Sequence, residues 1–290
     1  MAKIIILSGL PASGKSTKAK ELLASYGNAV RINRDLLRAM LHCDVWSDRK
    51  EDVTRQMAHA LARHLLCSPQ CGIVLIDDTN LSPRTIAAWQ CIAKEASAQC
   101  EIIRLNTPLQ ECLRRDALRE KPVGRHIILG MALQYGLYPK PQKGFVLCDL
   151  DGTLADTTHR QHFVAQEPKN WEGFFRAMVD DPVREDVLRQ VYALWKAGHP
   201  VFFVSGRPET YRGHTELWLR TAARWMQPTV FMRRAGDHRP DTVVKAEMLR
   251  TYWPDVSGIH CVFDDRPSVI REVWEAAGIS VIDCGDGREF

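Results

Sequence analysis

Gly9-Leu10-Pro11-Ala12-Ser13-Gly14-Lys15-Ser16-Thr17 is the stretch around which the chain is organised, and it follows the apolar run Ile4-Ile5-Ile6-Leu7. Its spacing is the P-loop pattern: backbone N–H groups surround phosphate, the lysine reaches the β and γ oxygens, and the serine ligates Mg²⁺. A glycine-rich turn without a ligand is the alternative, but the pattern's required buried strand and following helix are both indicated here. The sequence therefore predicts a nucleotide site formed by Gly9, Gly14, Lys15, Ser16 and Thr17.

Length and charge indicate two domains with different electrostatic character. The chain has 290 residues, of which 45% are hydrophobic and 8% aromatic, enough for two ordinary α/β domains. Residues 1–140 carry 20 Lys and Arg against 13 Asp and Glu, whereas residues 141–290 carry 19 against 22. The first half should therefore favour polyanions more than the second, which points towards nucleic acid.

The cysteines and the apolar runs indicate where in the cell the protein is located. The nine cysteines are scattered and form no CxxC pair, as expected for buried thiols of a reducing cytosol rather than for a zinc or redox site. No signal peptide precedes the P-loop, and no apolar run approaches ~20 residues. We expect a soluble cytoplasmic protein with no membrane partner.

A carboxylate follows the second apolar run. The predicted strand 29–32 leads into Asn33-Arg34-Asp35, which opens a helix. Ligands of open α/β sheets gather at this sheet edge, so Asp35 could take a proton from an acceptor hydroxyl, although Asn33 or Asp35 could equally be a helix cap. Arg34 and Arg38 flank Asp35 and would either hold acceptor phosphates or lie in solvent.

Two further segments of the first half carry candidate residues. The predicted strand 72–76 ends in Asp77-Asp78, where a Walker-B-like carboxylate belongs. The segment 121–125 has the composition of a hinged lid, whose Arg125 would close on the transferring phosphate or else lie exposed.

A linker rich in proline, glycine and lysine, residues 138–144, separates the halves, so we expect domains at 1–140 and 141–290. The next strand ends in Asp149-Leu150-Asp151-Gly152-Thr153, which puts two carboxylates on the same side. Such a pair needs a cation such as Mg²⁺ or a shared proton, and it suits an aspartyl nucleophile, Asp149, beside a general acid and base, Asp151. An Asp-Gly turn is the alternative.

Later segments supply matching parts in order. Ser205-Gly206-Arg207 ends a predicted strand and suits a phosphoryl oxygen, Lys245 lies early in a helix, and Asp264-Asp265 ends another strand. Residues 156–182 form an insertion that we expect to be a small cap. Its aromatic residues favour a packing core over a base-stacking surface, and His159 and His162 are assigned no metal.

These residues carry a family resemblance. The first half resembles P-loop polynucleotide 5′-kinases through the P-loop, Asn33-Arg34-Asp35 with Arg38, Asp78-Thr79-Asn80 and Arg125. The second resembles haloacid-dehalogenase-type phosphatases through its aspartate, serine, lysine and paired-aspartate motifs. In this order the chain is similar over nearly all its length to the bacteriophage T4-type polynucleotide kinase 3′-phosphatases.

The resemblance implies a fold and a chemistry. The fold would be a P-loop kinase-like parallel sheet followed by a Rossmannoid sheet with a cap. The activity would be ATP-dependent phosphorylation of 5′-hydroxyl ends and Mg²⁺-dependent removal of 3′-phosphate or 2′,3′-cyclic phosphate from RNA or DNA. The implied partners are nucleic-acid ends and a separate ligase, with the chain forming a homotetramer.

It also implies residue roles. Asp35 would be the general base, Arg38 and Arg125 would act on phosphate, Asp149 would attack and Asp151 would protonate the leaving oxygen. The substrate contacts would be Arg34, Asp78, Arg160, Ser205, Gly206, Arg207 and Lys245, and the metal ligands Ser16, Asp149, Asp151, Asp264 and Asp265.

Two other functions compete. A fused kinase and phosphatase acting on small metabolites would use the same motifs, but a small neutral acceptor would not need Arg34 and Arg38 beside Asp35. A nucleotide-gated scaffold with inactive sites is the non-enzymatic alternative, and no expected catalytic position is replaced.

Overall fold

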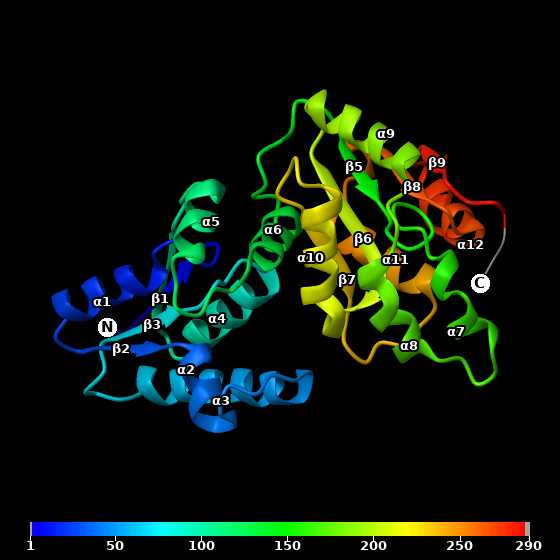
Figure 1. Cartoon of the computed structure of the whole chain (residues 1–290). Coiled ribbons are helices and arrows are strands. Elements are labelled where there is room, and N and C mark those ends of the chain that lie inside the picture. The colour runs from blue at the N-terminus through cyan, green and yellow to red at the C-terminus, as the bar shows by residue number, and fades with distance from the viewer. Residues whose placement is uncertain (1, 288–290) are drawn as a thin grey trace. The chain divides into compact units, whose positions relative to one another are not determined.

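The apolar runs form two separate parallel sheets, one in each half of the chain (Figure 1). The structure is a computed structural model that describes residues 2–287. The chain divides between Tyr138 and Pro139 into two compact units. The predicted fold class, two α/β domains with parallel sheets, is confirmed.

The first unit has a four-stranded sheet in the order β2-β3-β1-β4. Its strands are β1 (Lys3–Ser8), β2 (Ala29–Ile32), β3 (Ile73–Asp77) and β4 (Gln99–Arg104). The helices are α1 (Lys15–Ser25), α2 (Arg34–His42), α3 (Asp48–Leu66), α4 (Pro83–Glu95), α5 (Leu109–Ala117) and α6 (Arg125–Gln134).

Alternation along β1 explains how this sheet is covered on both faces. Ile4 and Ile6 are fully buried with side chains from α3 and α4, whereas Ile5 and Leu7 pack with Ala19 of α1 on the opposite face. Because successive strand residues point to opposite faces, a fully apolar strand requires a helix layer on each side. Leu7 pairs with Asp77, so the P-loop and the end of β3 meet at one sheet edge.

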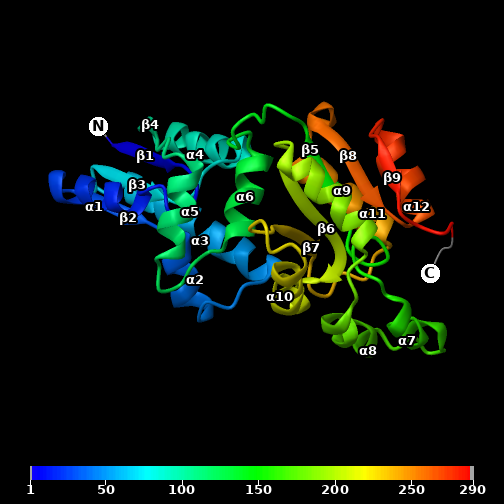
Figure 2. The same ribbon diagram turned by 45° about the horizontal axis from the view of Figure 1, so that its top comes forward.

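The second unit has a five-stranded sheet in the order β7-β6-β5-β8-β9, visible edge to edge in Figure 2. Its strands are β5 (Phe145–Cys148), β6 (Val201–Pro208), β7 (Val230–Arg233), β8 (Ile259–Asp264) and β9 (Val281–Asp283). The helices are α7 (His162–Ala165), α8 (Trp171–Arg176), α9 (Glu185–Lys196), α10 (Arg212–Ala222), α11 (Asp241–Tyr252) and α12 (Pro267–Val269).

The central strand β5 carries the second core. Val146 and Cys148 are fully buried against Val187 and Val191 of α9 and Trp218 of α10. Short helices between β5 and α9, including α7 and α8, form the insertion expected from the sequence. Its aromatic rings pack on one another, Trp171 on Phe174 with centroids 5.9 Å apart, as the core of a small substructure does.

Two general properties of the described residues complete the fold. All nine cysteines are free thiols. Among residues 2–287, no helix combines the length and the apolar character that crossing a bilayer requires.

Candidate active sites

The P-loop follows β1 and turns directly into α1. Gly14 has φ +98°, a left-handed conformation that glycine adopts without a Cβ penalty. The Lys15 ammonium donates to the carbonyl oxygens of Gly9, at 3.0 Å, and Leu10, at 2.6 Å. Burial lowers the pKa of Lys15 to about 8, although Asp77 and Asp78 partly oppose the effect. The lysine is thus held inside the loop, where phosphate oxygens would replace its carbonyl partners.

A cavity of about 370 Å³ opens beside this loop. Its lining includes Gly14, Lys15, Ser16 and Thr17, together with Arg115 of α5 and Arg119 just beyond it. Three positive side chains around a P-loop suit the β and γ phosphates of a nucleotide. The fit to ATP is therefore good, and Ser16 offers the hydroxyl that such a loop gives to Mg²⁺.

The predicted lid role of Arg125 stays a prediction. It is the first residue of α6 and is not among the residues that line the P-loop cavity. Burial lowers its pKa, with Tyr138 opposing the change. Arg115 of α5 and Arg119 just beyond it line that cavity instead.

The paired aspartates at the end of β3 have separate partners. Asp77 accepts from Arg31 Nε at 2.9 Å, and Asp78 accepts from Arg34 Nε at 2.9 Å and from its backbone N–H at 3.0 Å. Burial raises the pKa of Asp78, and the Arg34 guanidinium opposes it. The contacts with Asp78 hold Arg34 at the edge of the sheet. Separately, the Asn80 side chain links this strand end to β1 by donating to the Leu7 carbonyl at 2.8 Å.

The structure separates the roles of Asn33 and Asp35. The Asn33 side chain accepts from the Leu36 N–H and caps α2, so Asp35 has no capping role. The Asp35 side chain is 82% exposed and accepts from Arg38 Nη1 at 2.7 Å. Arg38 also pairs with Glu51 at 2.8 Å. An exposed carboxylate held by an arginine is accessible to an incoming hydroxyl.

In the second unit, Asp149, Asp264 and Asp265 bring their carboxylates together. One oxygen from each lies within 4.8 Å of the others, and all three residues are buried. The Lys245 ammonium lies 3.0 Å from Asp149 Oδ1 and 2.8 Å from Asp264 Oδ2. Asp241, one turn earlier in α11, lies 3.4 Å from Lys245. Three buried carboxylate oxygens are a donor set that Mg²⁺ prefers.

The charges of this cluster also favour the binding of a cation. Burial raises the pKa of Asp149 well above its usual value; Lys245 lowers it, and Asp264 and Asp265 raise it further. Burial likewise raises the pKa of Asp265 to about 6 despite Lys245. A divalent ion among these oxygens would remove the repulsion, so the residues fit Mg²⁺.

Glycine is required at two points of close approach. A Cβ on Gly152 would lie 2.0 Å from Asp265 Oδ2, and the backbone there has φ +84°. A Cβ on Gly206 would lie 2.4 Å from Asp241 Oδ1. Both glycines therefore let acidic side chains reach the cluster, which explains their place in the two motifs.

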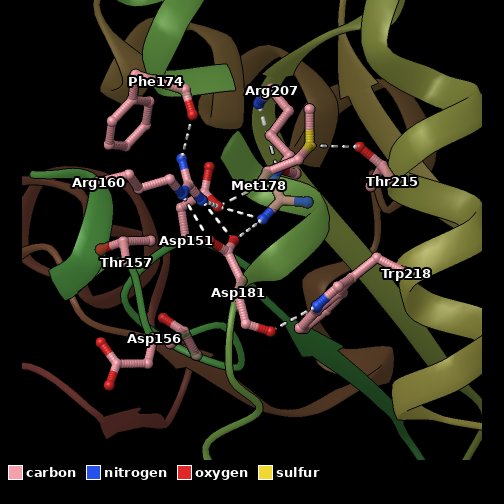
Figure 3. A network of polar contacts seen from close by, with 12 residues as sticks. Asp151, Asp156, Thr157, Arg160, Phe174, Met178, Asp181, Arg207, Thr215 and Trp218 are labelled. Carbon is pink, nitrogen blue, oxygen red and sulfur yellow. Dashed lines mark hydrogen bonds and ion pairs between the residues drawn. The ribbon is translucent and has the colours of Figure 1, made fainter. Parts of the chain in front are cut away.

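The Asp151 side chain lies outside the acidic cluster, and a metal role for this residue stays a prediction. Its Oδ1 accepts from Arg160 Nη2 at 2.5 Å and from Arg207 Nε at 2.8 Å, as Figure 3 shows. Burial would raise the pKa of Asp151, but Arg207 and Arg160 together hold it well below its usual range. The carboxylate turns to the arginines because their two positive charges compensate its burial.

The two arginines share a second carboxylate, that of Asp181 (Figure 3). Arg160 also lies 4.0 Å from the Phe174 ring centroid, so the cap insertion places this side chain over the site. Arg207 is fully buried, and its Nη1 has no hydrogen-bond partner among the described residues. That nitrogen is a free donor for a phosphoryl oxygen. Ser205 is also fully buried, and its hydroxyl accepts from the Arg207 N–H at 3.2 Å.

Several residues at these sites were not anticipated as site residues. Arg115 lies in α5 and Arg119 just beyond its end, and their spacing of four residues is a signal that could have paired them. Asp181 and Asp241 gave no such signal, since each precedes a helix or turn where an acidic residue is common.

Comparison with known proteins gives matches in both units. Residues 143–289 match the family model described as the polynucleotide kinase PNKP phosphatase domain, and residues 4–133 match an AAA domain model. A protein of Autographa californica nuclear polyhedrosis virus, named as a candidate bifunctional polynucleotide kinase/RNA ligase, is 27% identical over 99% of this chain. The match covers 43% of that viral protein.

Two further similarities are partial or distant. The L-seryl-tRNA(Sec) kinase of Methanococcus maripaludis is 28% identical over 54% of this chain, and the match covers 60% of that kinase. The chain thus spans less than two thirds of the length of either curated relative. A solved chain of a Pnkp1/Rnl/Hen1 complex is 25% identical, with a TM-score of 0.43, and the match covers 99% of this chain and 98% of that one.

Proposed function

Since residues 143–289 match its model, this chain belongs to the polynucleotide kinase PNKP phosphatase-domain family, and from that premise we propose that it heals nucleic-acid ends at two sites. The proposed activities are phosphorylation of 5′-hydroxyl ends by ATP and Mg²⁺-dependent removal of 3′-phosphate ends, including 2′,3′-cyclic phosphate, from RNA or DNA. Residues 1–140 would carry the kinase and residues 141–290 the phosphatase. The main support is that three separate sequence motifs, those of Asp149, Lys245 and Asp264-Asp265, meet in one buried cluster within the matched family.

In the kinase, the P-loop residues and the arginines of α5 would hold the triphosphate. Lys15, Arg115 and Arg119 supply positive charge where the γ-phosphoryl group develops negative charge during transfer. Asp35 would accept the proton of the 5′-hydroxyl as its oxygen forms a bond to phosphorus and the bond to the β-phosphate oxygen breaks. Arg38 keeps the Asp35 carboxylate in place.

In the phosphatase, Asp149 would attack the phosphorus of the 3′-phosphate and form an aspartyl phosphate while the bond to the 3′-oxygen breaks. Asp151 would give its proton to that oxygen and later take one from the water that hydrolyses the aspartyl phosphate. Mg²⁺ bound by Asp149, Asp264 and Asp265 would neutralise charge on the phosphoryl oxygens.

Asp151 must gain a proton before it can act as the acid of the first step. With both arginines on its carboxylate, the pKa of Asp151 is held well below its usual range, which favours the ionised form. A substrate phosphate brings oxygens that compete for Arg207 and Arg160, and a weaker hold on Asp151 restores its affinity for a proton. Substrate binding would thereby prepare the acid that the first step needs.

The products suggest a place in a longer reaction. A 5′-phosphate and a 3′-hydroxyl are the ends that a nucleic-acid ligase joins, so the chain would act before a separate ligase. The named activity of the viral relative combines such a kinase with an RNA ligase. A homotetramer stays a prediction from the resemblance, and a cytoplasmic location stays a prediction from the composition of the sequence.

Transfer of labelled γ-phosphate to a 5′-hydroxyl oligonucleotide tests the kinase against the small-metabolite alternative. Transfer to a free sugar or nucleoside, with none to the oligonucleotide, would favour that alternative. Mg²⁺-dependent hydrolysis of p-nitrophenyl phosphate by the wild type and Asp149→Asn tests the scaffold alternative, which requires equal rates for the two proteins.

A further inference from the structure

A row of aromatic side chains connects the cap to the segment that follows β6 in the second unit. Trp171 and Phe175 of α8 have nearly parallel rings, with centroids 6.0 Å apart and an interplanar angle of 23°. The Phe175 ring in turn lies 5.3 Å from the ring of Tyr211, which comes just after β6. We call Trp171, Phe175 and Tyr211 the aromatic row. The functions assigned so far use none of these three residues.

One end of the aromatic row is open to solvent. Trp171 is 49% exposed, whereas Phe174 of the same helix is 7% exposed and forms the packing core of the cap. The Lys169 ammonium lies 5.8 Å from the centroid of the Trp171 ring, and Lys169 forms no ion pair within residues 2–287. An exposed indole ring beside a lysine suits a ligand that is both aromatic and negatively charged, as a nucleotide is.

The exposed ring lies close to the proposed phosphatase site. Arg160 Nη2 donates to Asp151 at 2.5 Å, and the Arg160 guanidinium lies 4.0 Å from the centroid of the Phe174 ring, as can be followed in Figure 3. The Phe174 ring then meets the Trp171 ring edge-on, with centroids 5.9 Å apart. Only two side chains, Arg160 and Phe174, therefore separate Trp171 from the Asp151 carboxylate along this path.

The other end of the aromatic row follows the strand that carries the serine and arginine motif. Tyr211 comes four residues after Arg207, and Arg207 Nε donates to Asp151 at 2.8 Å. In a 3′-phosphate end, one sugar alone separates the phosphate from the base of the last nucleotide. A strand whose phosphate reaches Asp149 must therefore leave its last base near the residues around Asp151. The aromatic row offers that base a flat apolar surface.

We propose that the aromatic row stacks with the base of the 3′-terminal nucleotide, and that Trp171 is its main contact. This proposal rests on the proposed 3′-phosphatase function and names the group by which that site recognises a nucleic-acid end. Every base has a π surface, so stacking holds RNA and DNA ends of any sequence. A sugar phosphate has no such ring and is bound less tightly. The aromatic row positions the substrate and does not touch the reacting atoms.

The test compares Trp171→Ala with a matched control, Tyr192→Ala, in the same unit. Tyr192 of α9 is 38% exposed, and its ring stacks on that of Trp195 with centroids 6.0 Å apart and an interplanar angle of 27°. This is nearly the geometry of Trp171 on Phe175, but in a different aromatic cluster. The substrates are two 3′-phosphorylated hexanucleotides, one with adenine at its 3′-terminal residue and one with no base there, each assayed with saturating Mg²⁺.

For Trp171→Ala we expect the KM for the adenine-ended strand to rise about tenfold, the typical cost of removing one aromatic ring from under a base. The kcat should stay within about twofold, because the lost contact is equal in the ground and transition states. Trp171→Phe keeps a ring and should raise this KM by less than about threefold. The KM for the strand without a terminal base should be the same in all variants, and Tyr192→Ala should match the wild type on both strands.

An unchanged KM for the adenine-ended strand in Trp171→Ala would overturn the proposal, as would an equal rise for the strand without a terminal base or for Tyr192→Ala. If the wild type releases phosphate from neither strand, the phosphatase function fails instead. The aromatic row is then still tested by binding a 3′-phosphorylated strand that ends in 2-aminopurine, a base whose fluorescence falls when it stacks. Quenching by the wild type that Trp171→Ala abolishes supports the aromatic row. Quenching that survives in Trp171→Ala, or its absence with the wild type, refutes it.

Discussion

Asp181 binds Arg160 through both carboxylate oxygens, with Nε 2.7 Å from Oδ1 and Nη2 2.6 Å from Oδ2. Both side chains are fully buried, and Asp181 Oδ2 also accepts from Arg207 Nη2 at 2.9 Å. Asp181 therefore fixes the two arginines that control Asp151, without contacting the acidic cluster itself. We assign it as a positioning residue of the phosphatase.

Replacing Asp181 by asparagine should impair the phosphatase through these arginines. One buried negative charge is lost while two guanidinium groups stay buried, and breaking such a pair typically costs about 3–5 kcal/mol of stability. For protein that still folds, we expect kcat for 3′-phosphate removal to fall by about 10–100-fold with Mg²⁺ affinity unchanged. The pH dependence of kcat should also move, because the arginines set the pKa of Asp151.

The control for this variant is His159→Ala. His159 is the third partner of the Asp181 carboxylate, at 2.9 Å, but its side chain is 38% exposed and both arginines keep their contacts without it. We expect less than about a threefold change in kcat. If His159→Ala lowers kcat as much as Asp181→Asn does, the contacts of Asp181 with Arg160 and Arg207 are not the cause of the loss.

Removing the α5 arginines should affect only the kinase. Arg115→Ala and Arg119→Ala each remove a positive charge from the lining of the P-loop cavity, so we expect 5′-phosphorylation to fall by about 10²-fold or more. Arg125→Ala is the matched comparison, with a much smaller expected loss because Arg125 does not line that cavity. Steady-state kinetics with an oligonucleotide acceptor measure these losses of 5′-phosphorylation. A larger loss for Arg125→Ala than for Arg115→Ala or Arg119→Ala would support Arg125 as the lid arginine instead.

Divalent metal should bind at the acidic cluster and stabilise the second unit. Isothermal titration with Mg²⁺ should give one site that Asp265→Asn weakens, and metal should raise the Tm of the wild type. Asp156→Asn is a suitable control, since Asp156 is an acidic residue of the same unit that is not in the cluster. Mg²⁺ binding that persists undiminished in Asp265→Asn would place the ion elsewhere.

The two activities should be separable by mutation. The P-loop cavity and the acidic cluster are built by different units, so a change in one leaves the other's residues in place. Lys15→Ala should lower only 5′-phosphorylation, and Asp149→Asn only 3′-dephosphorylation. Each variant is assayed on both ends of the same oligonucleotide, and loss of both reactions from either change would contradict independent sites.

Much of this molecule could be predicted from its sequence, because many of its proposed site residues lie at the carboxyl ends of strands. Apolar runs fix the strands, and in a parallel sheet the residues just after each run meet at one edge. Asp149 follows β5, Asp264 ends β8 and Asp265 follows it; because β5 and β8 pair directly, the convergence of these residues was foreseeable from the order of the motifs. The helix 48–66 was also predictable, because its apolar positions recur with helical spacing.

What could not be predicted depends on side chains that reach across the fold. Asp181 and Arg160 are separated by 21 residues within an insertion whose short helices have no strong periodicity. Which arginines line the P-loop cavity depends on which segment packs beside the loop. Arg115, Arg119 and Arg125 all lie in one basic stretch, so the sequence alone does not distinguish them. Local sequence rules do not determine such tertiary placement.

The most direct test of the account uses one oligonucleotide that carries both a 5′-hydroxyl and a 3′-phosphate, offered as RNA and as DNA with labelled ATP and Mg²⁺. We predict that the wild-type chain adds the labelled phosphate to the 5′ end and releases inorganic phosphate from the 3′ end of at least one of the two. If neither end of either strand changes while a sugar or nucleoside gains the label, the chain does not heal nucleic-acid ends.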